Sequence, residues 1–237
     1  MTSGNLLNGG QMIIDYLIRE NVPYIFGLCG HGNISIIDAM YERSDDIKTI
    51  SVHHESVSGF MADVFYRVSG QPTATFTSCG PGSANLPIAL GNAFLDSVPF
   101  LAITGNVPTS QFNRGAFQEL YRHYQADFPS TVQAYCKRVY QPTRGEQVPL
   151  MVRQAWKTMV TGRPGPVVLD VPFDIFKEAA AEETPITTCK CLRFITVQKS
   201  RKCDGRTCSK ITPICCNCRA FFKIDFNVLD PSKSCMD

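Results

Sequence analysis

Glu55 is the first residue of this sequence whose surroundings could support acid–base chemistry. It follows His53 and His54, which come directly after an apolar run at 48–52, and it precedes a helical pattern at 56–68. A carboxylate at such a junction can serve a reaction, or it can cap the helix, because the first turn of a helix favours negative charge. Adjacent residues of a strand point to opposite faces, and the H-E-x-x-H spacing of zinc enzymes is absent. We therefore predict no metal site here and leave Glu55 between a catalytic and a capping role.

Glycine-containing segments follow three other apolar runs in the same way. They are 27–33, 78–85 and 105–108, and glycine lets a backbone approach a ligand closely. The first reads G-x-x-G-x-G, which differs from the dinucleotide pattern, and no acidic residue ends the next run to hold a ribose. No Gly-Lys-Ser/Thr follows a glycine-rich stretch, and Ser78 and Ser83 do not fit G-x-S-x-G. The segments therefore indicate a ligand site that is neither a dinucleotide site, nor a phosphate-binding loop, nor the nucleophile elbow of a hydrolase.

Short apolar runs alternate with helical patterns, and this order predicts the elements that carry Glu55 and the glycine segments. Such alternation is typical of a parallel sheet, and almost wholly apolar strands fit a sheet that is covered on both sides. We expect an α/β fold, a doubly wound six-stranded parallel sheet with helices on both faces, whose ligands bind at the carboxyl ends of the strands. The expected strands are 24–28, 48–52, 73–77, 100–104, 136–140 and 167–171, and the expected helices are 11–20, 34–43, 56–68, 86–95 and 147–160.

The ordered motifs of residues 8–178 resemble those of one enzyme family. His54-Glu55, Ala62-Asp63 and 66–70 are similar to the H-E-x(6)-A-D-x-x-A-R-x-(S/T)-G pattern of thiamine-diphosphate enzymes. Further segments follow in the family's order and spacing, at 78–85, 99–105, 116–119 and 165–172. The chain therefore resembles the N-terminal pyrimidine-binding domain of the acetolactate synthase family.

This resemblance implies a thiamine diphosphate cofactor that lies between the subunits of a dimer or tetramer. Glu55 would be the catalytic residue, hydrogen-bonded to N1′ of the pyrimidine ring so that the cofactor can lose its thiazolium C2 proton. The implied reaction decarboxylates a 2-oxo acid such as pyruvate and joins the product to a second carbonyl compound. The resemblance further assigns Gly30, Pro81, Gly82 and Asn85 to the cofactor, and Phe117 and Gln118 to the substrate.

The resemblance also implies that part of the site lies elsewhere. In the family, Mg²⁺ and the diphosphate are held by a separate C-terminal domain with a Gly-Asp-Gly motif, of which Cys203-Asp204-Gly205 is only an echo. FAD occurs in the family, but no residue here indicates an FAD site. We therefore expect this chain alone to be inactive. It would need a homo-oligomer or a complementing chain that carries the diphosphate-binding domain, and an apolar surface on its cofactor face would promote self-association.

Two departures from the family pattern leave the substrate open. Cys29-Gly30-His31 stands where synthases usually carry Pro-Gly-Gly, and Phe65-Tyr66 stands where Tyr-Ala is usual. Decarboxylases, acetyltransferases and ring-cleaving hydrolases of the same family share this N-terminal pattern.

The composition changes near Thr187 and predicts two regions, a domain at 1–186 and a Cys-rich basic tail at 187–237. Net charge is −4 over residues 1–188 and +6 over 189–237, and eight of the 11 cysteines lie in the second part. Cys203, Cys208, Cys215 and Cys218 could form a four-thiolate zinc site, although their spacing is loose. We favour an irregular, disordered or mis-joined tail. The alternative function is a non-catalytic module that binds zinc or a partner and reuses the fold.

Composition also limits the compartment and the partners. No apolar run approaches the roughly 20 residues of a membrane helix, and no signal peptide opens the chain, which predicts a cytoplasmic protein without a membrane partner. The first part is acidic and has no basic stripe, so nucleic-acid binding is not expected.

Overall fold

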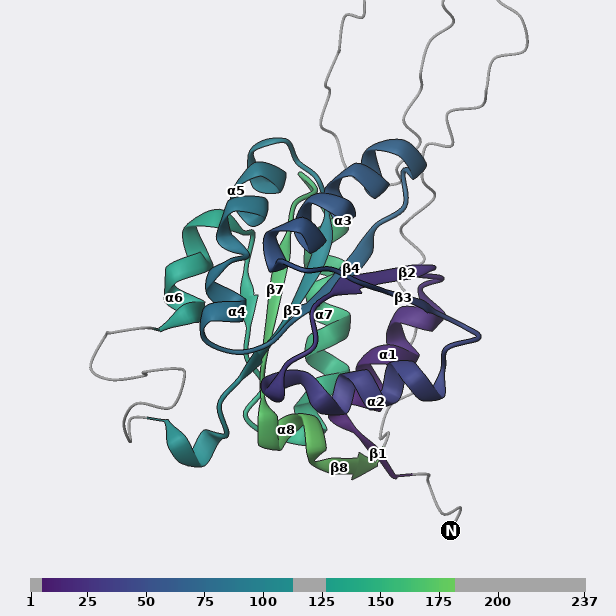
Figure 1. Cartoon of the computed structure of the whole chain (residues 1–237), viewed down its shortest axis with the longest axis vertical. Coiled ribbons are helices and arrows are strands. Elements are labelled where there is room, and N and C mark those ends of the chain that lie inside the picture. The colour runs from purple at the N-terminus through teal and green to yellow at the C-terminus, as the bar shows by residue number, and fades with distance from the viewer. Residues whose placement is uncertain (1–5, 113–126, 182–237) are drawn as a thin grey trace, which may run out of the picture. The chain divides into compact units, whose positions relative to one another are not determined.

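Six parallel strands form the central sheet. The computed structural model describes residues 6–112 and 127–181, and Figure 1 shows the sheet between layers of helices. The strands lie in the order β3-β2-β4-β5-β7-β6, and every neighbouring pair is parallel. Their bounds are β2 Tyr24–Gly27, β3 Lys48–Ser51, β4 Thr73–Thr77, β5 Phe100–Asn106, β6 Val139–Tyr140 and β7 Val167–Pro172.

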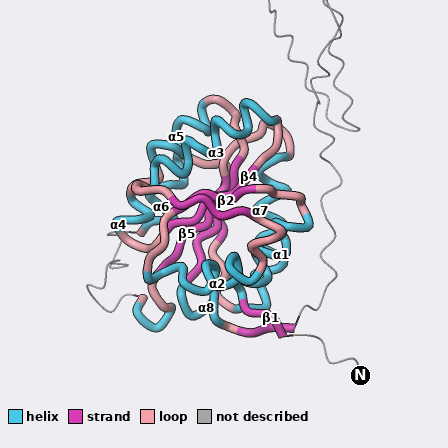
Figure 2. The backbone as a smooth tube through the Cα atoms, turned by 45° about the vertical axis from the view of Figure 1, so that its right-hand side comes forward, coloured by secondary structure: helices cyan, strands magenta, loops and turns pink. Residues whose placement is uncertain are grey.

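Helices cover both faces of this sheet, as Figures 1 and 2 show. One face carries α1 (Gly9–Arg19), α2 (Ile34–Glu42), α7 (Val148–Val160) and α8 (Phe173–Lys177). The other carries α3 (Glu55–Ser69), α5 (Pro87–Leu95) and α6 (Phe128–Val132). The remaining helices are short: α4 (Pro81–Ala84), η1 (His31–Asn33), η2 (Thr109–Gln111), η3 (Gln133–Tyr135) and η4 (Gly145–Gln147). The predicted doubly wound α/β fold is therefore confirmed.

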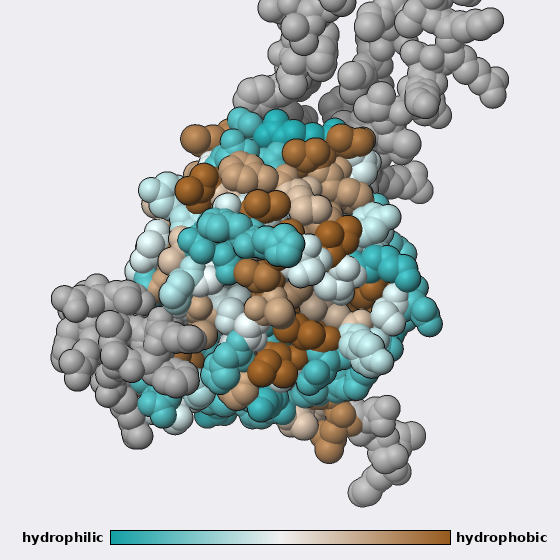
Figure 3. Space-filling model, viewed as in Figure 1, coloured by the Kyte–Doolittle hydropathy of each residue, from teal (hydrophilic) through white to brown (hydrophobic). Residues whose placement is uncertain are grey.

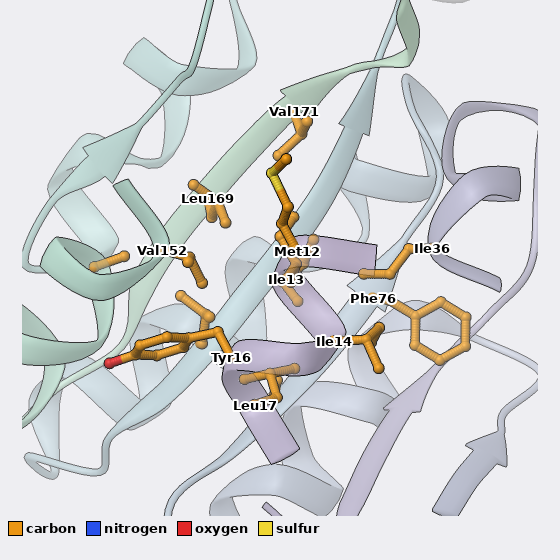
Figure 4. Close-up of a cluster of buried hydrophobic side chains, with 14 of the residues drawn as sticks. Met12, Ile13, Ile14, Tyr16, Leu17, Ile36, Phe76, Val152, Leu169 and Val171 are labelled. Atoms are coloured by element: carbon orange, nitrogen blue, oxygen red, sulfur yellow. The ribbon is translucent and has the colours of Figure 1, made fainter. Parts of the chain in front are cut away.

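The larger of the two cores lies between the sheet and α1, α2 and α7. Helix α1 begins at a capping box, in which Asn8 Oδ1 accepts from the backbone N–H of Gln11 and Gln11 Oε1 accepts from that of Asn8. Its apolar residues then recur on one face, so that Met12, Tyr16 and Leu17 are buried (Figure 4). Alternate residues of β5 and β7 point into this core, and the residues between them point into the second core under α3 and α5.

Most predicted elements match the structure within two residues at each end, with one clear exception. The strand expected at 136–140 is only Val139–Tyr140, and residues 133–135 form the short helix η3. The physical reason lies in β7, which pairs with β6 in the described sheet. The N–H of Lys137 still donates to the carbonyl of Pro166, but Pro166 has no N–H to donate in return, so the pairing ends there.

A two-stranded antiparallel sheet was not predicted. It pairs β1 (Leu6–Asn8) with β8 (Ala179–Ala181), joining the first and last described residues of the domain. Each strand has three residues, which is too short for an alternating pattern to stand out in a sequence.

Two sequence-based expectations concern segments beyond these elements. The Cys-rich tail, with its possible zinc ligands, lies outside the described residues, so the boundary at 186 stays a prediction. Within the described residues, no helix is long and apolar enough to cross a membrane. The cytoplasmic compartment also stays a prediction.

Candidate functional site

The loops that carry the glycine segments diverge at one place in the sheet. From β2, the chain passes through α2 on one face to β3, and from β3 it returns through α3 on the opposite face to β4. The loop after β2 and the loop after β4 therefore leave neighbouring strands toward different faces. Ligands of open α/β sheets bind in the crevice that forms at such a reversal.

Glu55 lies at this reversal with its side chain buried. It is the first residue of α3, and only 7% of its surface is exposed. Its Oε2 accepts a hydrogen bond of 2.9 Å from Nδ2 of Asn85, the C-cap residue directly after α4. The helix cap comes instead from His54, whose Nδ1 accepts from the backbone N–H of Ser56. The carboxylate of Glu55 is thus held by a tertiary contact with Asn85 and does not cap α3.

The loop after β4 places Gly82 directly beside this carboxylate. Gly80 has a φ of 59°, a backbone conformation that favours glycine, and Pro81 then opens α4 at its first position. A Cβ atom built at Gly82 would lie 3.2 Å from Glu55 Oε1, closer than most side-chain contacts. The absence of a side chain at Gly82 therefore leaves Oε1 without a close side-chain neighbour from this position.

The loop after β2 reaches the same region through Ser78. The side chain of Asn33 closes this loop on itself, because Oδ1 accepts from the N–H of Gly30 and Nδ2 donates to the carbonyl of Leu28. The N–H of Gly32 donates to Ser78 Oγ at 3.2 Å, and a Cβ at Gly30 would meet that same hydroxyl. Ser78 thereby joins the two glycine segments.

The structure brings together most of the residues that the sequence singled out. Glu55, Gly82 and Asn85 are in contact, Pro81 adjoins them as an exposed residue, and Gly30 is linked to them through Ser78. Phe117 and Gln118 lie outside the described residues. His53 and His54 are both exposed, and among the described residues no three His, Cys, Asp or Glu side chains cluster as a metal site would require.

Sequence reasoning missed a second polar cluster at the same edge of the sheet. Asp170 in β7 is fully buried and binds side chains of β5 and of the residue after β6. The signal was available, because Asp170 is the one charged residue in the apolar run 167–171.

The arrangement is a doubly wound sheet with a buried glutamate at its reversal, and similarity to known proteins identifies its family. The family model "Thiamine pyrophosphate enzyme, N-terminal TPP binding domain" matches residues 7–126. The chain therefore belongs to this family.

Within the family, the chain is similar to acetolactate synthases. It is 34% identical to the mitochondrial catalytic subunit of Saccharomyces cerevisiae over 182 residues, which are 77% of this chain and 25% of that protein. It is 37% identical to acetolactate synthase of Arthrospira platensis over 71% of this chain and 28% of the relative. The large subunit of isozyme 1 of Escherichia coli is 34% identical over 70% of this chain and 28% of its own length. The chain thus spans about a quarter of the length of these relatives.

The described residues fit the pyrimidine half of thiamine diphosphate. Of the two oxygens of Glu55, Oε2 is engaged by Asn85, and Oε1 faces the side-chain-free position of Gly82. A ring nitrogen that shares a proton with Oε1 suits this buried carboxylate better than an anionic group does, because like charges repel. The buried carboxylate is also costly unless a partner satisfies it.

Proposed function

We propose that this chain is the pyrimidine-binding part of a thiamine-diphosphate-dependent enzyme that acts on 2-oxo acids, as an acetolactate-synthase-like carboligase or decarboxylase. The buried carboxylate of Glu55, held by Asn85 and open toward Gly82, is the observation that supports it. The family membership and the similarity to acetolactate synthases support the same proposal.

Glu55 would hold a proton at N1′ of the pyrimidine ring. Thiamine diphosphate supplies an acidic carbon on its thiazolium ring, from which the nucleophile for the 2-oxo acid forms. Asn85 holds one oxygen of Glu55, which would leave the other to hydrogen-bond the ring. Gly30 and Gly82 would let the backbone of both loops approach the cofactor. Burial excludes water from the shared proton and strengthens the hydrogen bond.

The diphosphate and Mg²⁺ would be held by a second domain, supplied by a complementing chain or another subunit of a homo-oligomer. An apolar groove of about 580 Å³ supports the need for such a partner. It runs along α3, which carries Glu55 at its first residue, and Val57, Phe60, Val64 and Val68 lie exposed there. Figure 3 shows hydrophobic side chains gathered over α3 and α5. No feature of the described residues supports a site for FAD.

Complementation tests this proposal. The full chain is mixed with a C-terminal acetolactate synthase fragment that carries the diphosphate-binding domain, and product formation from pyruvate is measured with thiamine diphosphate and Mg²⁺. We expect turnover from the mixture and none from either part alone. Glu55→Gln should lower the rate at least ~100-fold, since proton transfer by a positioned group contributes that much. Glu146→Gln is the matched control, because Glu146 is an exposed glutamate in η4, directly before α7.

Ligand-observed NMR with thiamine diphosphate and the full chain provides a second readout that does not depend on complementation. Saturation transfer to the pyrimidine protons should be seen with the wild type and lost in Glu55→Gln. Equal transfer in both proteins, or full activity of Glu55→Gln in the mixture, would contradict the role of Glu55. Turnover by the purified chain alone would contradict its dependence on a second domain. Zinc binding without any thiamine diphosphate signal would favour the non-catalytic module.

A further inference from the structure

A buried carboxylate lies at the second place where the sheet reverses its order. The chain passes from β5 through α6 on one face to the edge strand β6, and returns through α7 on the other face to β7, between β5 and β6. Asp170 lies in β7 at this reversal and is fully buried. It plays no part in the proposed chemistry of Glu55.

Asp170 ties three segments together. Its Oδ1 accepts a hydrogen bond of 2.7 Å from Thr104 Oγ1 in β5. Its Oδ2 accepts from Asn106 Nδ2 at the end of β5 and from Gln141 Nε2 just after β6, each at 2.7 Å. Two of the three donors thus belong to the carboxyl end of β5.

Asn106 passes this restraint on to the chain that leaves β5. While its Nδ2 donates to Asp170, its Oδ1 accepts from the backbone N–H of Val107 at 2.7 Å. Both ends of the amide are therefore engaged, which fixes the direction of the first residue after the strand.

The end of β5 also touches the loop that carries Gly30. A Cβ atom at Gly105, between Thr104 and Asn106, would lie only 2.5 Å from the carbonyl oxygen of Gly32. Two backbones therefore meet here without an intervening side chain. Because Gly32 in turn donates to Ser78, a displacement of β5 at this point would change the distance between the two glycine segments.

We propose that Asp170 is a positioning residue for the cofactor loop at 28–33, acting through Asn106 and the backbone of Gly105 on Gly32. That the loop at 28–33 binds the cofactor rests on the proposed function. The contacts that connect Asp170 to this loop lie within the chain and do not depend on it.

The type of residue at 170 agrees with a positioning role. Burial raises the pKa of Asp170 to about 6, an effect that the charge of Asp127 reinforces and the three hydrogen bonds oppose. An apolar side chain would be cheaper in a sheet of this kind, since replacing buried charges by hydrophobic groups is often neutral or stabilising. A carboxylate, however, accepts all three hydrogen bonds at once.

Backbone amide signals of the full chain test this coupling without any cofactor. Asn106→Ala removes the connection between Asp170 and the end of β5, and should shift the ¹H–¹⁵N signals of Gly32 and Gly105 by more than their linewidths. Gln141→Ala is the matched control, because Gln141 binds the same oxygen of Asp170 from the β6 side. It should leave Gly32 unmoved. The amide of Asp170→Asn can still accept from both Asn106 and Gln141 and can donate to Thr104. The Gly32 signal of Asp170→Asn should therefore stay close to that of the wild type, whereas that of Asp170→Ala should shift.

An unchanged Gly32 signal in Asn106→Ala, or an equal shift of this signal in Gln141→Ala, would overturn the inference. This test holds even if Asp170→Ala fails to fold. In the complemented enzyme, Asn106→Ala should weaken the binding of thiamine diphosphate about tenfold, and Gln141→Ala should leave this affinity unchanged. The proposed function fails separately, if Glu55→Gln binds the cofactor as well as the wild type while the Gly32 shift is still observed.

Discussion

At the scale of single residues, the surroundings of Glu55 depend on Gly82. Any side chain at Gly82 would occupy the space that we assign to the pyrimidine ring, because its first atom already lies 3.2 Å from Oε1. Gly82 also lies within α4, where alanine is a better helix former than glycine. Function and local stability therefore make opposite demands at this position.

Gly82→Ala should separate these two demands. We expect at least ~10-fold weaker binding of thiamine diphosphate in the complemented enzyme, since a methyl group would displace the ring or Glu55. The free energy of unfolding should change by less than about 1 kcal/mol, because the helix gains alanine while the methyl group crowds Glu55. Cofactor titration and chemical denaturation measure the two effects. Gly91→Ala, a helical glycine of α5, is the control, and unaltered cofactor affinity in Gly82→Ala would contradict our assignment.

At the scale of elements, α3 has two tasks besides carrying Glu55. Its exposed side offers the apolar groove, and its buried side is joined to α5 by a polar network around Asp63. Asp63 is almost fully buried and accepts hydrogen bonds from Arg67 in α3 and from Asn92 in α5. Arg67 also pairs with Asp96, directly after α5. The position of Glu55 therefore depends on how these two helices pack.

Asp63→Ala should cost about 2 kcal/mol in the free energy of unfolding, because it removes the acceptor for two helices from a buried position. Asp96→Ala should cost less than about 1 kcal/mol, since Asp96 and Arg67 are both half exposed. The fluorescence of Trp156, the one tryptophan of the chain and fully buried, can follow denaturation. Equal losses in both variants would show that the network does not depend on burial.

At the scale of the whole molecule, the apolar groove on α3 predicts self-association when no partner domain is present. Exposed apolar patches of this kind mark interaction surfaces. Val64→Lys places a charge in the groove and should reduce the concentration-dependent mass seen by sedimentation velocity, with little change in stability because Val64 is 57% exposed. Leu150→Lys changes an exposed apolar residue of α7 and should have no such effect. A wild-type chain that stays monomeric at high concentration would contradict this prediction.

The stability of the whole domain should also depend on pH through Asp170. Burial raises the pKa of this carboxyl to about 6, whereas an exposed aspartate has a pKa near 3.9. The folded protein therefore binds the proton more readily than the unfolded chain, so the ionised group destabilises the fold above pH ~6, and this cost disappears as pH falls toward 4.

Asp170→Asn should remove this dependence, because asparagine does not titrate. The free energy of unfolding of the wild type, relative to that of Asp170→Asn, should rise on the order of 2 kcal/mol between pH 7 and pH 4.5. Chemical denaturation at both pH values measures the difference. A constant difference would show that Asp170 does not titrate in this range.

The fold, and the position of the candidate site at the carboxyl ends of the strands, could be predicted from the order of residues along the chain. Runs of five mainly apolar residues between helical patterns specify the strands of such a sheet, so five of the six strands were predicted within two residues. Glu55 and the glycine segments follow such strands, which places them at one edge of the sheet. Residue type and spacing are enough here, because these features are local in the chain.

Which of these residues contact one another could not be predicted from local patterns. Asn85 contacts Glu55 across 30 positions, Ser78 joins Gly30 to Gly82, and Gly105 reaches Gly32 over 73 positions of chain. Both reversals follow from the strand order, which depends on which face of the sheet each connecting helix covers. The same strand order brings Asp170 next to Thr104 and Gln141, with which it forms hydrogen bonds. No local pattern encodes the distribution of helices over the two faces. It depends on how all the helices together bury their apolar faces against the two sides of the sheet.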